Sequence, residues 1–347
     1  MKFTRRAMLR LTALAPVMRP LMAQAPAPPA GRSTVSLVQG EDRRRMAAAA
    51  LEAIDEQIRP ALAAKKYVVI KANCVANPNA LSATHPDTLH GILDYLEPRF
   101  KGPVVVAEAS SSDTMQGYEQ YGYNRLAAER RSQQVQLVDL NREAKFRVVP
   151  LMNYDLHVTR ARLAARLFDP DAFVIGSAVL KSHNVLVATL SIKNMCMGAP
   201  LHSIPGETPR WTDKRVAHNG VRQTNYNMFL VAQALKPNWG VTLIDGYQGM
   251  EGDGPASGTP VDSRIAIAST DFVAADRVGV EAMGIDPAWP GYLNYCGDFG
   301  IGQYDLAQIE VRGAKIADVQ KKYKLHKDIE RELQWMGPMQ ELPPRIG

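Results

Sequence analysis

One stretch of the chain, residues 169–198, constrains the fold more than any other. It opens with a Pro-Asp turn and a short apolar run from Ala172 to Ala178, which is typical of a buried strand. Polar and reactive side chains then follow in quick succession, namely Lys181, His183, Lys193, Asn194 and Cys196. Because open α/β sheets bind ligands beyond the carboxyl ends of their strands, this order predicts a buried strand that leads directly into a site.

The spacing of Lys181 and His183 places both side chains on one face if the strand continues to Asn184, since side chains alternate along a strand. A lysine beside a histidine, with a second lysine and a cysteine close by, can form a covalent, acid–base or metal site. The other interpretation is a lysine and a polar histidine at a solvated strand end. Spacing alone leaves both open.

Apolar runs of strand length alternate with helical patterns through most of the chain. Strands are predicted near 67–73, 103–109, 135–140, 172–178, 241–246, 264–269 and 308–311, and helices near 46–62, 84–96, 118–131, 223–235 and 272–283. This alternation predicts an α/β fold, layered, with a mostly parallel or mixed sheet and helices on both faces. Thr84 and Asp87 have capping-box spacing at the start of the second helix, and Asp271 is the expected cap of the last.

Four of the predicted strands end in polar residues: Asn73, Glu108, the pair Lys181 and His183, and Asp245. Strand ends that converge on one crevice are the default site of such sheets. Two loops contribute further candidates. The polar loop 200–220 carries His218, and the acidic loop 249–255 carries Glu251 and Asp253. The acidic loop matches neither nucleotide-binding glycine motif and suits a cation or a wrapped ligand, unless its glycines only form a tight connection.

These residues favour an exported enzyme that depends on a metal or another cofactor and acts on a small anionic or carbonyl substrate through a Lys/His site. The expected catalytic residues are Lys181, His183, Lys193 and His218. The expected substrate-binding residues are Lys71, Asn73, Asn194 and Glu251. A divalent metal is a further possibility, with His183, Asp245, Asp253 and Cys196 as its ligands. The alternative is a non-catalytic exported protein, associated with electron transfer, that binds a metal or an anion through the same side chains.

The N-terminus predicts export. Arg5 and Arg6 precede a short, mildly apolar segment and the small-residue pattern Ala23-Gln-Ala25, as in a twin-arginine signal. The expected organisation is a signal and tether over 1–30, an α/β domain over 31–315 and a helical tail over 316–347. Partners are then the export machinery and a small-molecule or metal ligand, in the periplasm or outside the cell, with no stable membrane anchor after cleavage.

Charge and cysteine content argue against two classes of function, nucleic-acid binding and iron–sulfur chemistry. The formal net charge is +6, but Lys2, Arg5, Arg6, Arg10 and Arg19 all lie in the signal, which leaves a mature chain of about +1. No long basic run remains, so nucleic acid is not an expected partner. The three cysteines form no Cys-x-x-Cys motif, so an iron–sulfur cluster is not expected.

Several motifs together resemble the family known as domain of unknown function 362. They are Thr84-His-Pro, Leu180-Lys-Ser-His with Thr189-Leu-Ser-Ile-Lys-Asn, Asp245-Gly with Gly249-Met-Glu-Gly-Asp-Gly-Pro, and Ala268-Ser-Thr-Asp-Phe-Val-Ala-Ala-Asp. The resemblance runs from about Val68 to Gly313 and implies a prokaryotic α/β protein whose chemistry is not established. Many relatives add a ferredoxin-like cysteine segment, which this chain lacks.

Overall fold

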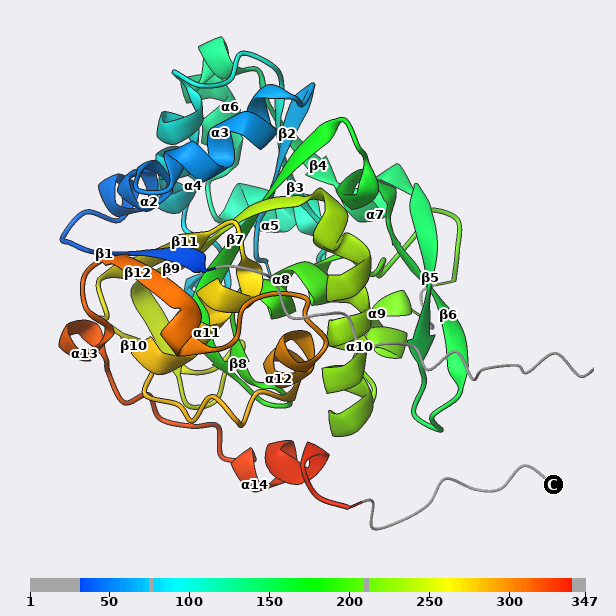
Figure 1. The fold of residues 1–347 in the computed structure, drawn as a ribbon. Coiled ribbons are helices and arrows are strands. Elements are labelled where there is room, and N and C mark those ends of the chain that lie inside the picture. The colour runs from blue at the N-terminus through cyan, green and yellow to red at the C-terminus, as the bar shows by residue number, and fades with distance from the viewer. Residues whose placement is uncertain (1–31, 75–77, 209–211, 339–347) are drawn as a thin grey trace, which may run out of the picture.

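The computed structural model describes residues 32–74, 78–208 and 212–338. The predicted twin-arginine signal lies outside the described residues. Figure 1 shows a large twisted sheet covered by helices on both faces. The predicted α/β class, with a layered and mixed sheet, is therefore confirmed.

The main sheet has the strand order β12-β1-β11-β9-β7-β2-β3-β4. Its central strands β9, β7, β2, β3 and β4 run parallel to one another, whereas β11 is antiparallel to both β9 and β1. Two short strands, β8 and β10, extend the sheet beside β7 and β9. The bounds are β1 Ser33–Gln39, β2 Tyr67–Lys71, β3 Val104–Glu108, β4 Val135–Asp139, β7 Ala172–His183, β8 Val187–Thr189, β9 Trp239–Glu251, β10 Thr259–Val261, β11 Ile265–Ser269 and β12 Ile309–Gly313.

Alternation along the central strands builds a separate apolar core on each face. In β2, Val68 and Ile70 belong to one core, while Val69 belongs to the other. The first core is covered by α2 Arg43–Glu52, α3 Asp55–Ala63, α4 Pro86–Leu96, α5 Thr114–Gln120 and α6 Asn124–Glu129. The second is covered by α8 Ser191–Gly198, α10 Val221–Leu235, α11 Phe272–Ala282 and α12 Gly291–Asp298.

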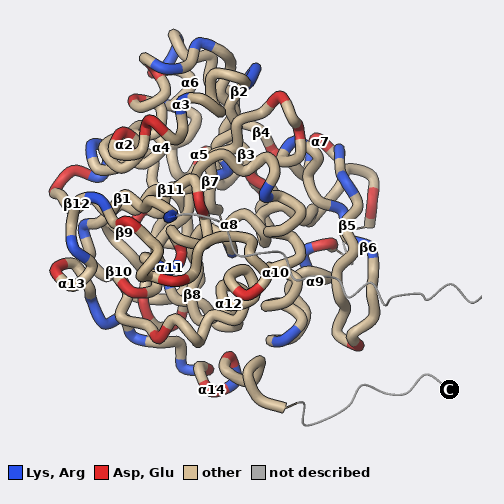
Figure 2. The backbone as a smooth tube through the Cα atoms, in the orientation of Figure 1, with Lys and Arg blue, Asp and Glu red and all other residues tan. Residues whose placement is uncertain are grey.

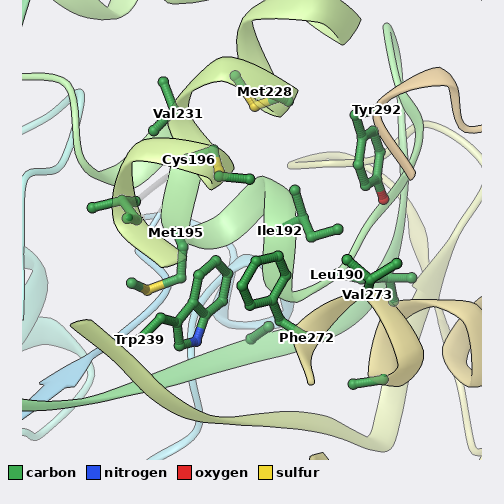
Figure 3. Close-up of a cluster of buried hydrophobic side chains, with 14 of the residues drawn as sticks. Leu190, Ile192, Met195, Cys196, Met228, Val231, Trp239, Phe272, Val273 and Tyr292 are labelled. Atoms are coloured by element: carbon green, nitrogen blue, oxygen red, sulfur yellow. The ribbon is translucent and has the colours of Figure 1, made fainter. Parts of the chain in front are cut away.

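The second core holds α8 in place. Trp239 stacks on Phe272 with ring centroids 4.1 Å apart, and Ile192, Met195 and Cys196 of α8 pack in the same apolar cluster (Figure 3). The opposite side of the same helix carries Lys193, Asn194 and Met197. Helical spacing separates these two groups, which gives α8 one apolar and one polar face.

The structure differs from the local predictions in four places. The helix expected over 118–131 is two shorter helices, α5 and α6. The helix expected over 46–62 is two helices, α2 and α3, because the backbone leaves the helical region at Ile54. The cap of α4 is His85, whose Nδ1 accepts the Asp87 amide at 3.1 Å, rather than Thr84. Strand β1 was not anticipated. The expected cap of α11 by Asp271 is confirmed, since its carboxylate accepts the amides of Val273 and Ala274.

Smaller elements complete the described chain. A separate two-stranded sheet is formed by β5 Phe146–Met152 and β6 Val158–Ala164. Short helices α7 Leu140–Glu143 and α9 Asp213–Ala217 lie between the larger elements, and the C-terminal part has only short helices, α13 Ile316–Val319 and α14 Ile329–Glu332. In the part of the chain that the structure describes, no helix has the length and apolar character needed to cross a membrane.

Candidate functional site: a cationic pocket

A cavity of about 480 Å³ opens at the carboxyl ends of the central parallel strands. Asn73 follows β2, Glu108 ends β3 and His183 ends β7, and all three line the cavity, as do Lys193 and Asn194 of α8. The rim is formed largely by the segment that leads into and through α9, with His202, Lys214, Arg215 and His218. Three of the four predicted strand ends therefore meet at one site.

A buried ion pair forms the floor beside the cavity. Lys71 Nζ lies 2.8 Å from Glu108 Oε1, with the two side chains 0% and 4% exposed. Glu108 also accepts the backbone amides of Cys74 and Ala109, and Lys71 donates to the Ala72 carbonyl and to Asn194 Oδ1. The opposite charges of Lys71 and Glu108 neutralise each other. Lys71, which was predicted to bind substrate, does not line the cavity and instead positions Asn194.

Lys193 is the buried cation that faces the cavity. Its side chain is 4% exposed, and no hydrogen bond or ion pair joins its amine to another described residue. Burial lowers its pKa to about 8, with Glu108 opposing and Lys71 adding to the shift. The amine is therefore mostly protonated at pH 7, with a substantial neutral fraction just above it.

Two further cations come from α9 at the rim. Lys214 is half-buried and donates to the Met197 carbonyl at 2.7 Å, and burial lowers its pKa to about 7. Arg215 is exposed beside it. Neither residue was among the predicted site residues, because the loop 200–220 has no periodicity that fixes which side chains point inward.

Two histidines stand side by side in the pocket, with ring centroids 5.6 Å apart. His183 Nδ1 accepts the backbone amides of Val185 and Leu186 at 3.0 and 3.3 Å, so the proton of the neutral ring is on Nε2. Burial, followed by the charge of Lys193, holds the pKa of His183 well below its usual value and lowers that of His218 to about 4. Both rings are neutral at pH 7, one as an Nε2–H donor.

The start of α8 is fixed by a residue distant in sequence. Asp276 of α11 is fully buried and accepts the amides of Ser191 and Ile192 at 2.8 and 3.0 Å, which are the first amides of α8. Burial raises the pKa of Asp276 to about 7 against these hydrogen bonds. Its carboxylate thus fixes the helix that presents Lys193.

The structure does not bring every predicted residue to the pocket. Lys181 is fully buried away from the cavity and donates to the Ser82 carbonyl at 2.9 Å. Glu251 accepts the Lys324 amide and pairs with its amine. The cavity thus begins at His183, two residues beyond Lys181 in β7.

The four predicted metal ligands are also separated. Asp245 accepts the Thr88 hydroxyl at 2.6 Å and lies 3.3 Å from Arg43, Asp253 lies beside His326 and Lys327, and Cys196 is in the apolar core. Across residues 32–74, 78–208 and 212–338, no group of three or more His, Cys, Asp or Glu side chains is placed to hold a metal ion. All three cysteines are buried in this part of the chain, and no disulfide joins them.

Comparison with known proteins places the chain in a family. A model of the domain of unknown function DUF362 matches residues 68–281, more than half of the sequence. The chain belongs to the DUF362 family. The matched segment contains every pocket residue named above, so the pocket lies in the part of the molecule that defines a DUF362 protein.

Individual relatives are more distant. A thylakoid-associated protein of Synechocystis sp. is 31% identical over 129 residues, which cover 37% of the DUF362 chain described here and 37% of that protein. The chain thus spans little more than a third of the length of this curated relative. A crystal structure of a Thermotoga maritima protein has a TM-score of 0.39 and 12% identity, over 64% of this chain and 55% of that one.

Gly198, at the end of α8 in the DUF362 chain, leaves no room for a side chain. A Cβ there would overlap the Lys71 amine and press on Glu108 Oε1 at 3.1 Å. Gly198→Ala is therefore expected to destabilise the protein by about 1–3 kcal/mol through disruption of the buried pair. Urea denaturation measures the effect, with Gly337→Ala as the matched control, because a Cβ there would meet only the Gln334 carbonyl oxygen, at an ordinary contact distance of 4.0 Å. Equal stability of the two variants would contradict the packing described.

Proposed function

We propose that this protein is an enzyme that acts on a small anionic or carbonyl-containing substrate in the cationic pocket. The charge balance of the lining carries the proposal. Lys193, Lys214 and Arg215 contribute positive charge, and the carboxylate among the described lining residues, Glu108, is neutralised by Lys71. A cavity of about 480 Å³ with such a lining suits a small carboxylate, since the cations attract it and no carboxylate without a cationic partner repels it.

The positions of the side chains give each a role. Lys193 and Lys214 bind the anionic group. The neutral fraction of the Lys193 amine can attack a carbonyl and form a Schiff base, with the carbonyl oxygen leaving as water, or it can remove a proton from the substrate. His183 donates its Nε2–H to a substrate oxygen. His218 is neutral and accepts a proton, and the negative charge of a bound anion would raise its pKa above about 4.

The test combines binding with chemistry. Isothermal titration calorimetry compares pyruvate and 2-oxoglutarate with propionate and glutarate, which lack the carbonyl, and with the cation putrescine. Proton exchange at the carbon beside the carbonyl is followed by NMR in deuterated water. We expect carboxylates to bind, putrescine not to bind, and the oxo acids to take up deuterium. Binding without any chemical change would instead indicate a non-catalytic ligand-binding protein, and preference for putrescine would refute the proposal.

The affinity for a carboxylate is expected to fall as pH rises from about 6 to about 10. The lowered pKa values of Lys214, about 7, and Lys193, about 8, mean that each amine loses its positive charge within this range. Because the anion favours the protonated amines, affinity is highest below pH 7 and falls by up to about tenfold per pH unit for each amine. Calorimetry at several pH values measures this, and Lys193→Met should lack the step near pH 8. A flat or rising profile would be inconsistent with anion binding by these lysines.

We further propose that the protein is exported through the twin-arginine route to the periplasm or beyond. The support is the paired Arg5 and Arg6 before a short apolar segment. In cell fractionation, Arg5→Lys combined with Arg6→Lys is expected to remove the protein from the exported fraction, whereas Arg19→Lys should leave export intact. Equal distribution of the two variants would rule out this route.

A further inference from the structure

Exposed apolar side chains gather on the two-stranded sheet β5–β6. Among the described residues, Phe146, Val148, Tyr154 and Val158 are 45%, 48%, 66% and 75% exposed, and only two other large apolar residues are comparably exposed. Such clustering on one element differs from the scattered surface apolar residues that any protein has. Figure 1 shows this hairpin at the edge of the molecule, beside α9 and α10.

Strand register shows that these residues share one face. Val148 lies opposite Arg162, and Val158 lies opposite Met152. Since residues two apart and residues directly opposite point the same way, Phe146, Val148 and Val158 all project outward. The other face packs into the second core through Val149, Leu151, Ala161 and Leu163.

The hairpin is firmly attached to the body of the protein. Asn227 of α10 both accepts the Met152 amide and donates to the Met152 carbonyl, each at 2.8 Å, and Gln223 donates to the Tyr154 carbonyl at 2.7 Å. The outward apolar face is therefore presented in a fixed orientation, and a partner that binds it need not order a loose segment.

Basic residues lie on the apolar face and beside it. Arg160, opposite Pro150 on the apolar face, is exposed and no ion pair joins it to another described residue, whereas Arg162, opposite Val148, pairs with Glu207 and Asp213 and stacks on Phe146. Lys145 and Arg147 are also exposed and have no ion pair with a described residue, but alternation places them on the other side of β5, where Arg147 stacks on Phe168. The acid of the hairpin, Asp155, is in its turn. Figure 2 shows Lys and Arg along these two strands. A second copy of the same face would bring these like charges together, which disfavours self-association.

We propose that the β5–β6 face docks the protein peripherally on an anionic lipid surface. Aromatic and aliphatic side chains mixed with arginine and lysine suit the boundary between headgroups and acyl chains, where the apolar groups insert and the cations pair with phosphates. Tyr154, at the turn, has an apolar ring and a polar hydroxyl, as residues at this boundary commonly do. This contact is separate from the pocket and does not depend on the proposed catalytic function.

The test is co-sedimentation with vesicles of equal parts phosphatidylglycerol and phosphatidylcholine. The protein is used in the form in which it is isolated from cells. The triple variant Lys145→Gln, Arg147→Gln, Arg160→Gln is expected to lower affinity about a hundredfold at low salt. Phe146→Ser with Val148→Ser and Val158→Ser should lower it at least about tenfold. Matched controls elsewhere on the surface are Arg125→Gln with Arg131→Gln, and Phe299→Ser, which should bind as the unchanged protein does.

Two readouts keep the result interpretable. Circular dichroism melting shows whether each variant is folded, and Tyr154→Trp reports insertion through a blue shift of its fluorescence with anionic vesicles only. Equal loss of binding in the control variants would overturn the proposal. Absence of vesicle binding would also overturn the proposal, even if the same face binds an acidic protein or a second copy of the chain.

Discussion

Replacing Glu108 with alanine is expected to destabilise the protein by about 3–5 kcal/mol, because it leaves the Lys71 ammonium buried without its partner. Both side chains are almost completely inaccessible to water, and Lys71 retains only an amide oxygen and a carbonyl as acceptors. The variant also deprives the Cys74 and Ala109 amides of their acceptor. The free energy of unfolding from urea denaturation measures the loss.

An exposed pair provides the control for Glu108→Ala. Lys66 and Asp171 are 2.8 Å apart, but their side chains are 76% and 47% exposed, so Asp171→Ala should cost less than about 1 kcal/mol. The double variant Lys71→Met, Glu108→Leu should recover part of the stability, because it removes both buried charges together. A loss from Glu108→Ala no larger than that from Asp171→Ala would show that the pair is not buried as described.

Lys193→Met is expected to weaken carboxylate binding at least about tenfold and to abolish any turnover that depends on the amine. The substitution removes the buried cation of the pocket while keeping a side chain of similar length. Calorimetric affinity and single-turnover rate measure the two effects. Folding should be retained, because Lys193 has no hydrogen-bond or ion-pair partner among the described residues and a buried unpaired ammonium is itself unfavourable.

Lys181→Met is the matched control for Lys193→Met. Lys181 is also a buried lysine on the same stretch of chain, but it donates to Ser82 and does not line the cavity. Its replacement should leave affinity within about twofold of the unchanged protein, an effect of only a few tenths of a kcal/mol. If Lys181→Met weakens binding as much as Lys193→Met, the pocket has been assigned to the wrong lysine.

Much of the site follows from the sequence because strand ends are predictable. Asn73, Glu108 and His183 each follow or end a strand whose apolar run is clear, and parallel strands present their carboxyl ends at one edge. Asp245 fails this rule because β9 continues to Glu251. Within that longer strand Asp245 alternates with Ile244 and shares the face of Val241 and Leu243, under α2, where it pairs with Arg43.

The remaining site residues depend on tertiary packing. On α8, Cys196 follows Lys193 by three residues, yet one packs in the core and the other lines the cavity, and which face is buried depends on α10 and α11. Asp276 contacts Ser191 across 85 positions of sequence. Lys214 and Arg215 lie on a short helix in a loop without hydrophobic periodicity. No local pattern encodes such long-range placements.

The position of a bound carboxylate in a crystal structure tests the central claim most directly. Crystals grown with the tightest-binding carboxylate from the calorimetric panel are predicted to show it in the cavity, with its carboxylate oxygens within hydrogen-bond distance of Lys193 Nζ and another oxygen near His183 Nε2. A carboxylate bound elsewhere, or a cavity occupied by a cation beside Glu108, would contradict the anion-binding site proposed here.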